Sequence, residues 1–217
     1  MINVITVKYG NKIYNHEYVN RMYNMISKNL SLPFNFYCLT EDAIGLDENI
    51  NVIPLPLEYG LHSWWWKTYM FKPGLFEHDV NFYIDLDMII LSNIDHWMTF
   101  FPNRFLGLRD VGYVKNQNLN SLGSGVLRWK NNEYSDIWEY MQTNAPNIMR
   151  TYRMSGDQGY IWAKHYMDIT FWPTEWYESF KWELEKNGHK PSANILVFHG
   201  SRKPHNTRHP IILEYWK

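Results

Sequence analysis

The sequence predicts an α/β fold in which a mainly parallel sheet is flanked by helices. Short apolar segments alternate along the chain with segments whose apolar residues recur at helical spacing, a pattern typical of a sheet covered on both faces. No repeat, low-complexity tract or linker-like run interrupts the 217 residues, which are enough for one sizeable core. We therefore expect one continuous domain over residues 1–217.

The first half of the chain carries a clear alternation of strands and helices. Val19, Met22 and Ile26 recur at helical spacing, and Pro33 separates this helix from the next apolar segment. The run from Val80 to Leu91 is the longest apolar one, so we expect it to form a central strand. The expected elements are strands at 2–7, 34–39, 50–55 and 80–91, and helices at 18–30 and 63–71.

The second half continues the pattern and ends in a polar loop. An amphipathic helix is expected around Tyr134–Met141, and a second helix is expected to begin near Ser155. Strands are expected at 104–108, 125–129 and 194–199, the last leading into the polar segment 200–205. In such folds ligands gather outside the carboxyl ends of the strands.

Composition narrows the classes of partner. The formal net charge of −1 gives no basic surface for nucleic acid, so nucleic acid is not an expected partner. Cys38 is the only cysteine, which excludes an internal disulfide, and no secretory signal or membrane span is recognisable, so we expect a cytoplasmic protein. The aromatic content of 18% suggests that some rings stack on nucleobases or sugars, the alternative being a tryptophan-rich core.

Two aspartates lie inside the longest apolar run. On an extended chain, Asp85 and Asp87 project from the same face, where two carboxylates repel each other and are costly to bury unpaired. A divalent cation would compensate them, and Mn²⁺ or Mg²⁺ suits oxygen ligands and neutralises a diphosphate. The alternative is a chance Asp-x-Asp pair at a solvated strand end or turn. We interpret the pair as a candidate site for a divalent metal.

The late polar loop could complete such a site. His199 ends the last expected strand and could be a third metal ligand, although a single histidine is often structural. Gly200 would let the backbone approach a phosphate closely, and Lys203 could place its charge on a departing diphosphate. His205 and His209 are expected to be structural.

Several stretches stand out in order and together span nearly the whole chain. These stretches are Val7-Lys-Tyr-Gly10 with Tyr18-Val-Asn-Arg21, Pro33–Asp42, Trp65-Trp-Lys67 leading to Phe71–Phe76, Asp85-Leu-Asp87, Gly156-Asp-Gln158 and Phe198–Pro204. Taken together, they resemble small GT-A-fold glycosyltransferases related to the glycogenin-like enzymes and to compact viral and bacterial members.

The resemblance implies a nucleotide-binding part at about residues 1–91 and a sugar and acceptor part at about 92–217. The donor would be a nucleotide-sugar, by resemblance a UDP-sugar, and the acceptor a glycan or another hydroxyl compound. The metal ligands would be Asp85, Asp87 and His199, with Asp85 also on the ribose. The expected donor contacts are Thr6, Val7, Tyr9, Lys67, Asp85, Leu86, Ser124, Gln158, Gly200 and Lys203.

Individual roles follow from the same resemblance. Tyr9 would stack on the nucleobase, and Lys67 would lie near the donor unless it belongs to a solvated helix face. Asp157 would be the general base of an inverting enzyme; in a retaining enzyme Asp157 and Gln158 would lie beside the reacting sugar. The spacing of Ser155 and Gln158 also fits a capping box at a helix start.

The chain departs from its relatives at Leu122–Val126, where they usually carry an amide that contacts the donor sugar. Here that amide is missing or displaced to Asn120. Ser124 could contact the sugar through its hydroxyl, or the flanking glycines could make a turn or bulge. The identity of the sugar therefore stays open.

Two other functions compete with glycosyl transfer. A metal-dependent phosphohydrolase also uses a carboxylate pair at a strand end, but usually after its first strand. A carbohydrate-binding or inactive module would use the aromatic rings without chemistry, and the retained Asp85, Asp87 and His199 argue against it.

Overall fold

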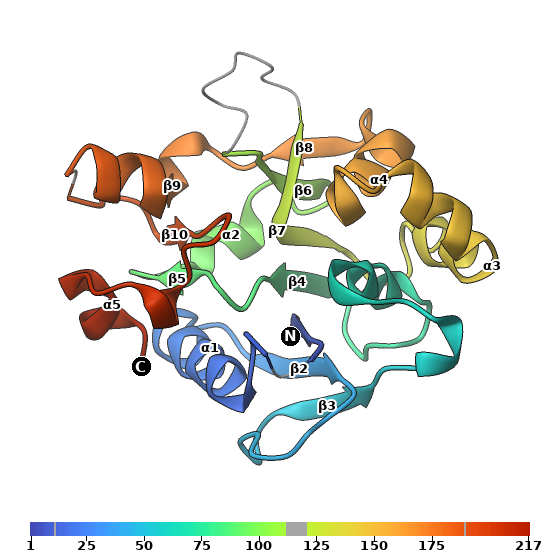
Figure 1. Cartoon of the computed structure of the whole chain (residues 1–217), viewed down its shortest axis with the longest axis horizontal. Coiled ribbons are helices and arrows are strands. Elements are labelled where there is room, and N and C mark those ends of the chain that lie inside the picture. The colour runs from blue at the N-terminus through green and yellow to red at the C-terminus, as the bar shows by residue number, and fades with distance from the viewer. Residues whose placement is uncertain (11, 112–120, 189) are drawn as a thin grey trace.

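A central sheet crosses the molecule (Figure 1), which we describe from a computed structural model covering residues 1–10, 12–111, 121–188 and 190–217. Its strands are β1 (Ile2–Lys8), β2 (Phe34–Thr40), β3 (Asn51–Pro54), β4 (Val80–Ile84), β6 (Phe105–Arg109), β7 (Leu122–Lys130) and β8 (Ile169–Phe171), in the order β3-β2-β1-β4-β7-β6-β8. Strand β7 runs antiparallel to β4 and β6, and the other neighbouring pairs are parallel. The expected α/β fold with a mainly parallel sheet is confirmed.

Helices cover both faces of this sheet because successive side chains of its strands point to opposite sides. Val4 packs in the core that contains helix α1 (His16–Asn29), and Ile5 packs in the core that contains the 3₁₀ helix η2 (Ser63–Phe71). The α1 side also holds α2 (Asp95–Thr99) and α5 (Pro210–Tyr215), and the η2 side holds α3 (Asp136–Thr151) and α4 (Gly156–His165). Shorter helical turns are η1 (Leu57–Tyr59), η4 (Thr174–Trp176), η5 (Phe180–Lys186) and η6 (Pro204–Asn206). Of the helices described, none combines the length and apolar character needed to cross a membrane.

The expected single strand over residues 80–91 is wrong. Strand β4 ends at Ile84, and a turn follows in which the Met88 amide donates to the Asp85 carbonyl at 3.1 Å. The chain then enters a second sheet of β5 (Ile89–Ile90), β10 (Ile195–Val197) and β9 (Tyr177–Ser179), in the order β5-β10-β9. Both halves of the run are buried, so its apolar character alone did not reveal the break.

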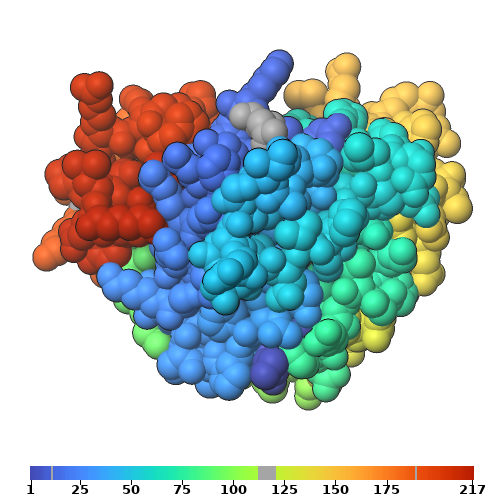
Figure 2. Space-filling view, turned by 90° about the horizontal axis from the view of Figure 1, so that it is seen from below, coloured from blue at the N-terminus to red at the C-terminus, as the bar shows by residue number. Residues whose placement is uncertain are grey.

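The C-terminal segment lies against helix α1. The guanidinium of Arg21 stands 4.1 Å over the Trp216 ring, and the Tyr18 ring packs against the same indole. Figure 2 shows these C-terminal residues, in red, beside the N-terminal ones, in blue. The Tyr18 hydroxyl also meets His205 Nδ1 at 2.5 Å, so His205 has the structural role expected for it. His209 is structural as well, because its side chain caps α5 by accepting from the Ile211 amide.

Most of the tryptophans belong to the core. The side chains of Trp66, Trp97, Trp129, Trp138 and Trp172 are among the largest that are fully buried. The tryptophan-rich core that the composition allowed is therefore present. Trp64 differs from them, since it is about half exposed.

Candidate active site

A pocket of about 450 Å³ opens where β1 and β4 end, at the edge of the sheet where ligands were expected. Its volume is in the usual range for small-molecule sites. Of the site residues expected from the sequence, the pocket is lined by Val7, Tyr9, Lys67, Asp85, Leu86, Asp87, Ser124, Asp157, Gln158, His199, Gly200 and Lys203. Thr6 is fully buried within β1 and is not part of the lining.

The second sheet explains how residues more than a hundred positions apart meet. Strands β5 and β10 are antiparallel, with Ile90 opposite Ile195 and Ile89 opposite Leu196. The residues just before β5 therefore lie across from those just after β10. Asp87 and His199 reach the same pocket because each stands at one of these ends.

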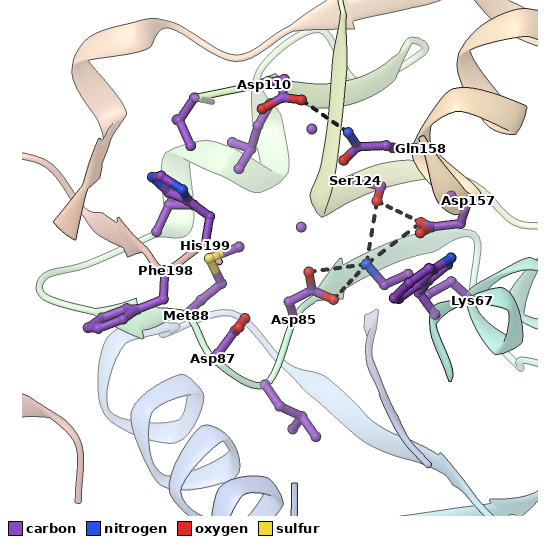
Figure 3. A pocket seen from close by; sticks show the side chains of 18 of the residues that line it. Lys67, Asp85, Asp87, Met88, Asp110, Ser124, Asp157, Gln158, Phe198 and His199 are labelled. Atoms are coloured by element: carbon purple, nitrogen blue, oxygen red, sulfur yellow. Dashed lines mark hydrogen bonds and ion pairs between the residues drawn. The ribbon is translucent and has the colours of Figure 1, made fainter. Parts of the chain in front are cut away.

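Lys67 is the centre of a charged network on one wall of the pocket (Figure 3). Its ammonium lies 2.8 Å from Asp85 Oδ1 and 3.7 Å from Asp157 Oδ2. The Ser124 hydroxyl donates to Asp157 Oδ2 at 2.6 Å and is 3.4 Å from the same ammonium. Lys67 is buried, so the alternative that it belongs to a solvated helix face is wrong.

Burial and charge act in opposite directions on this network. Burial raises the pKa of Asp85 above its ordinary value, and Lys67 opposes that rise. Burial likewise raises the pKa of Asp157, against Lys67 and the Ser124 hydrogen bond. Burial would lower the pKa of Lys67, but the carboxylates of Asp157 and Asp85 outweigh it and raise that pKa. One buried cation therefore serves the buried carboxylate of Asp157 and the partly buried carboxylate of Asp85, and each group depends on the others.

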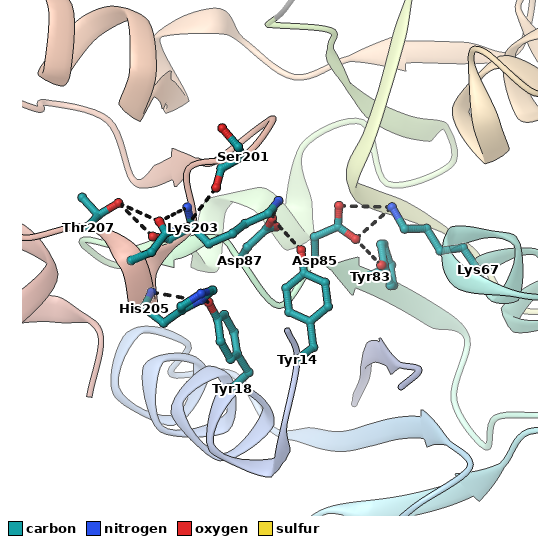
Figure 4. Close-up of polar contacts among 11 residues, drawn as sticks. Tyr14, Tyr18, Lys67, Tyr83, Asp85, Asp87, Ser201, Lys203, His205 and Thr207 are labelled. Atoms are coloured by element: carbon teal, nitrogen blue, oxygen red, sulfur yellow. Dashed lines mark hydrogen bonds and ion pairs between the residues drawn. The ribbon is translucent and has the colours of Figure 1, made fainter. Parts of the chain in front are cut away.

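Asp87 has its own partners on the opposite side of the turn (Figure 4). Its Oδ2 atom lies 2.5 Å from the Lys203 ammonium and accepts from the Tyr14 hydroxyl at 3.0 Å. Asp87 is buried, so it is not the solvated turn residue that a chance Asp-x-Asp pair would give. The expectation that Lys203 lies at the site is consistent with this contact.

Two tyrosines at the site were missed in the sequence. The Tyr83 hydroxyl donates to Asp85 Oδ1, and it could have been found, because residues two apart on a strand share a face. Tyr14 reaches Asp87 from the loop before α1. No local pattern connects Tyr14 to a residue 73 positions away, so only the tertiary structure reveals it.

His199 is held by a hydrogen bond at the rim of the second sheet. Its Nε2 atom lies 2.7 Å from the Ser179 hydroxyl oxygen. Burial, together with the charges of Lys181 and Lys203, lowers the pKa of His199 below its ordinary value. A lowered pKa favours the neutral ring, which is the form that binds metals.

The donor types of the expected metal set fit Mn²⁺ or Mg²⁺. Asp85 and Asp87 offer carboxylate oxygens, His199 offers a neutral imidazole, and all three line the same pocket. Within the described part of the chain, no three acidic, histidine or cysteine side chains are drawn together as a metal-binding group. The carboxylates are instead compensated by Lys67 and Lys203.

The start of α4 is as expected, but the capping box is wrong. The Ser155 side chain makes no capping hydrogen bond, and Gln158 Nε2 instead donates to Asp110 Oδ2 at 3.0 Å. Ser155 has helix-like backbone angles and Gly156 has a φ of +63°, whereas a capping residue normally has extended backbone. Gln158 is thereby turned into the pocket.

The departure at residues 122–126 is a strand with an irregular register. The pairing of β6 with β7 shifts between Gly107 and Leu108, which supports the bulge considered from the sequence. A Cβ atom on Gly125 would lie 2.2 Å from Met88 Cε and 3.2 Å from Asp85 Oδ2, so Gly125 leaves room for the Asp85 turn. Asn120, the other candidate for a sugar contact, lies outside the described residues.

Solved structures of glycosyltransferases match the chain over nearly its full length. GlyE of Streptococcus pneumoniae TIGR4 has a TM-score of 0.70 and 14% identity, over 99% of this chain and 60% of GlyE. An active-site mutant of LgtC has a TM-score of 0.71 and 10% identity, over 98% of this chain and 93% of LgtC. Mouse xyloside xylosyltransferase 1 has a TM-score of 0.57 and 12% identity, over 92% of this chain and 97% of that enzyme.

The fold of the chain is the GT-A fold of these glycosyltransferases, as the sequence resemblance implied. LgtC, a galactosyltransferase, has also been solved in complex with donor and acceptor sugar analogs. No protein-family model and no curated protein matches the sequence. The likeness to these enzymes therefore concerns the fold alone.

Proposed function

We propose that this chain is a metal-dependent glycosyltransferase that moves a sugar from a UDP-sugar to a hydroxyl group of a glycan. The observation that carries the proposal is the convergence of Asp85, Asp87, His199 and Lys203 on one pocket of a GT-A fold. The pocket joins two carboxylates and an imidazole with a lysine suited to a diphosphate.

Asp85, Asp87 and His199 would hold the metal, Mn²⁺ or Mg²⁺. When bound, the metal would stabilise the negative charge that develops on the nucleoside diphosphate as it leaves. In the structure Lys203 supplies the positive charge beside Asp87. We propose that Lys203 transfers this contact to the diphosphate when donor and metal bind, because a phosphate oxygen offers it a second anionic partner.

The remaining donor contacts follow from the lining of the pocket. Val7 and Tyr9, at the end of β1, would hold the nucleobase, with Tyr9 exposing its ring for stacking. Gly200, at a φ of +70°, leaves the loop without a side chain where a phosphate would approach. Leu86 and Gln158 would contact the ribose and the sugar, respectively.

The chemical step exchanges one bond for another at the anomeric carbon. The bond from this carbon to the diphosphate oxygen breaks, the bond to the acceptor oxygen forms, and the acceptor hydroxyl loses a proton. In an inverting reaction Asp157 would take that proton. In a retaining reaction Asp157 and Gln158 would lie beside the reacting sugar, and a donor phosphate oxygen would take the proton.

The decisive experiment is a panel of nucleotide-sugars with Mn²⁺ or with chelator, scored by thermal shift and by slow donor hydrolysis. A donor present at 100 times its Kd stabilises by about 2.7 kcal/mol, which corresponds to a Tm increase of about 5–10 °C for a chain of this size. Asp87→Ala should abolish this response while the variant stays folded, judged by circular dichroism and a single melting transition.

The results distinguish the competing functions. No metal-dependent response to any donor would refute the proposal. Release of phosphate from phosphomonoesters without any nucleotide-sugar would favour a phosphohydrolase. Glycan binding that is indifferent to chelator, without donor binding, would favour a carbohydrate-binding module.

A further inference from the structure

Trp64 stands out in a run of three tryptophans at the start of η2. It is 49% exposed, whereas its neighbours Trp65 and Trp66 are 2% and 0% exposed. Trp64 also lines the pocket, and no aromatic ring or cation among the described residues is paired with it. A large apolar ring is therefore left open to solvent at the candidate active site.

The backbone on both sides of the pocket mouth places this ring. Ser63 has a φ of +53°, a conformation that costs free energy in a residue with a side chain, and Trp64 follows it directly. Across from it, a Cβ atom on Gly156 would lie 2.8 Å from Trp64 Nε1. The indole can occupy this place because Gly156 has no side chain.

The location of Trp64 separates it from the proposed diphosphate contacts. It packs beside Gly156, next in sequence to Asp157, which belongs to the Lys67 network. The diphosphate contacts proposed above come instead from the loop after β10, where Lys203 meets Asp87. Met154, which is 89% exposed, lines the pocket on the same side as Gly156.

We propose that Trp64 forms the acceptor subsite and takes a pyranose ring of the acceptor glycan, a proposal that rests on the proposed transferase function. The flat indole offers its face to the apolar C–H face of the sugar, and the exposed Met154 adds an adaptable apolar contact. The acceptor hydroxyl would then point towards Asp157. This assigns a pyranose as the sugar nearest the reaction centre.

The kinetic test separates acceptor binding from donor binding. Trp64→Ala should raise the KM for methyl pyranoside acceptors about 10-fold or more, whereas the donor KM and the rate of donor hydrolysis change less than about twofold. Trp64→Phe should recover part of the loss because it restores a flat ring. Tyr140→Ala is the matched control, since Tyr140 on α3 is 51% exposed and does not line the pocket. It should behave like the native protein.

A binding measurement does not depend on turnover. The indole N–H signals of the 11 tryptophans can be followed by NMR, and the one that Trp64→Phe removes belongs to Trp64. Titration with methyl α- and β-pyranosides of glucose, galactose and xylose, in the presence of UDP and Mn²⁺, should shift this signal selectively. Absence of that shift, or an effect of Trp64→Ala on donor KM alone, would overturn the assignment. Absence of binding of any nucleotide-sugar donor by the native protein would instead refute the proposed transferase function.

Discussion

The Lys203 ammonium lies 2.5 Å from Asp87 Oδ2, although the two residues are 116 positions apart. Both side chains are largely buried, so each charge depends on the other for compensation. Asp87 stands in the turn after β4, and Lys203 follows the loop after β10. The pair therefore ties the turn that carries Asp85 and Asp87, two of the proposed metal ligands, to the segment after β10 that carries the proposed diphosphate contact.

Replacing Lys203 should weaken nucleotide binding more than metal binding. Lys203→Met removes a cation from the proposed diphosphate site and frees the Asp87 carboxylate. We expect the Kd for UDP with Mn²⁺ to rise about 10- to 100-fold, as loss of a charge-assisted contact predicts. The Kd for Mn²⁺ alone should fall or stay unchanged. Calorimetric titration measures both, and Lys203→Arg should retain most of the nucleotide affinity. Unchanged UDP affinity in Lys203→Met would contradict the proposed role.

Asp157 can be tested with a variant that preserves its shape. Asp157→Asn keeps a hydrogen-bonding partner for Ser124 but removes the carboxylate, so kcat should fall about 100-fold or more if the group takes part in proton transfer. Donor affinity should change less than about threefold. Ser124→Ala, which removes a hydrogen bond to Asp157 but leaves its carboxylate, should lower kcat about 10-fold or less. Normal turnover by Asp157→Asn, measured with the donor found in the panel and a methyl pyranoside acceptor, would exclude Asp157 as the base.

Arg128 should be a major stabilising residue of the α2 region. Its buried guanidinium donates to the carbonyl oxygens of Met98, Phe100 and Phe101, at 2.5, 2.7 and 2.6 Å, respectively. These carbonyls lie at the end of α2, where a cation is favourable, and Phe101 has a positive φ of 39°. Arg128→Met leaves the three oxygens without this donor.

We expect Arg128→Met to lower the free energy of unfolding by about 2–4 kcal/mol. Urea unfolding followed by circular dichroism measures the change. Arg128→Lys keeps the charge but not the forked geometry of the guanidinium. Its free energy of unfolding should therefore lie between those of the native protein and Arg128→Met. A loss below about 0.5 kcal/mol in Arg128→Met would show that the carbonyls find other partners.

Asp136 should make stability depend on pH in the acid range. Burial raises its pKa, but the Lys164 hydrogen bond and the charges of His165 and Lys164 outweigh that effect, and the folded-state pKa lies below the ordinary value. The stabilisation is therefore fully present above the unfolded pKa, near 4, and is lost as the pH falls through the lower folded pKa. Because the side chain is about half exposed, the effect should stay below about 1 kcal/mol.

Asp136→Asn isolates this contribution. At pH 7 the variant should be slightly less stable than the native protein in urea unfolding, and the difference should shrink between about pH 4 and pH 2. A stability difference between the two proteins that grows as the pH falls would contradict a lowered pKa of Asp136 in the folded state. The control is Asp168→Asn, which removes the neighbouring carboxylate that meets His165 Nδ1 without touching Lys164.

Much of the fold could be predicted because its signals are local. The helical spacing of Val19, Met22 and Ile26 needs only the residues within one turn or two, and it located α1. The alternation of such helices with short apolar strands led to the parallel sheet. The break between β4 and β5 could not be predicted, since a buried strand reads as apolar in whichever sheet it pairs.

The candidate site shows the same division. Asp85, Asp87 and His199 were recognisable because their polar side chains stood out beside apolar segments, and Asp157 was expected from the family resemblance. Their partners were not all recognisable. Gln158 fitted a capping box by spacing, yet it bonds Asp110 because the backbone of Ser155 does not adopt the extended form that capping requires.

From the sequence alone, the alternation of strands and helices over much of the chain and the residue types available for chemistry were determined, because both depend on neighbouring residues. Only the tertiary structure decided which charges compensate one another. Lys67 meets Asp85 and Asp157, and Lys203 meets Asp87. These contacts depend on the pairing of β5 with β10 and on the close approach of Asp85 to Gly125, which arise only when distant segments pack together.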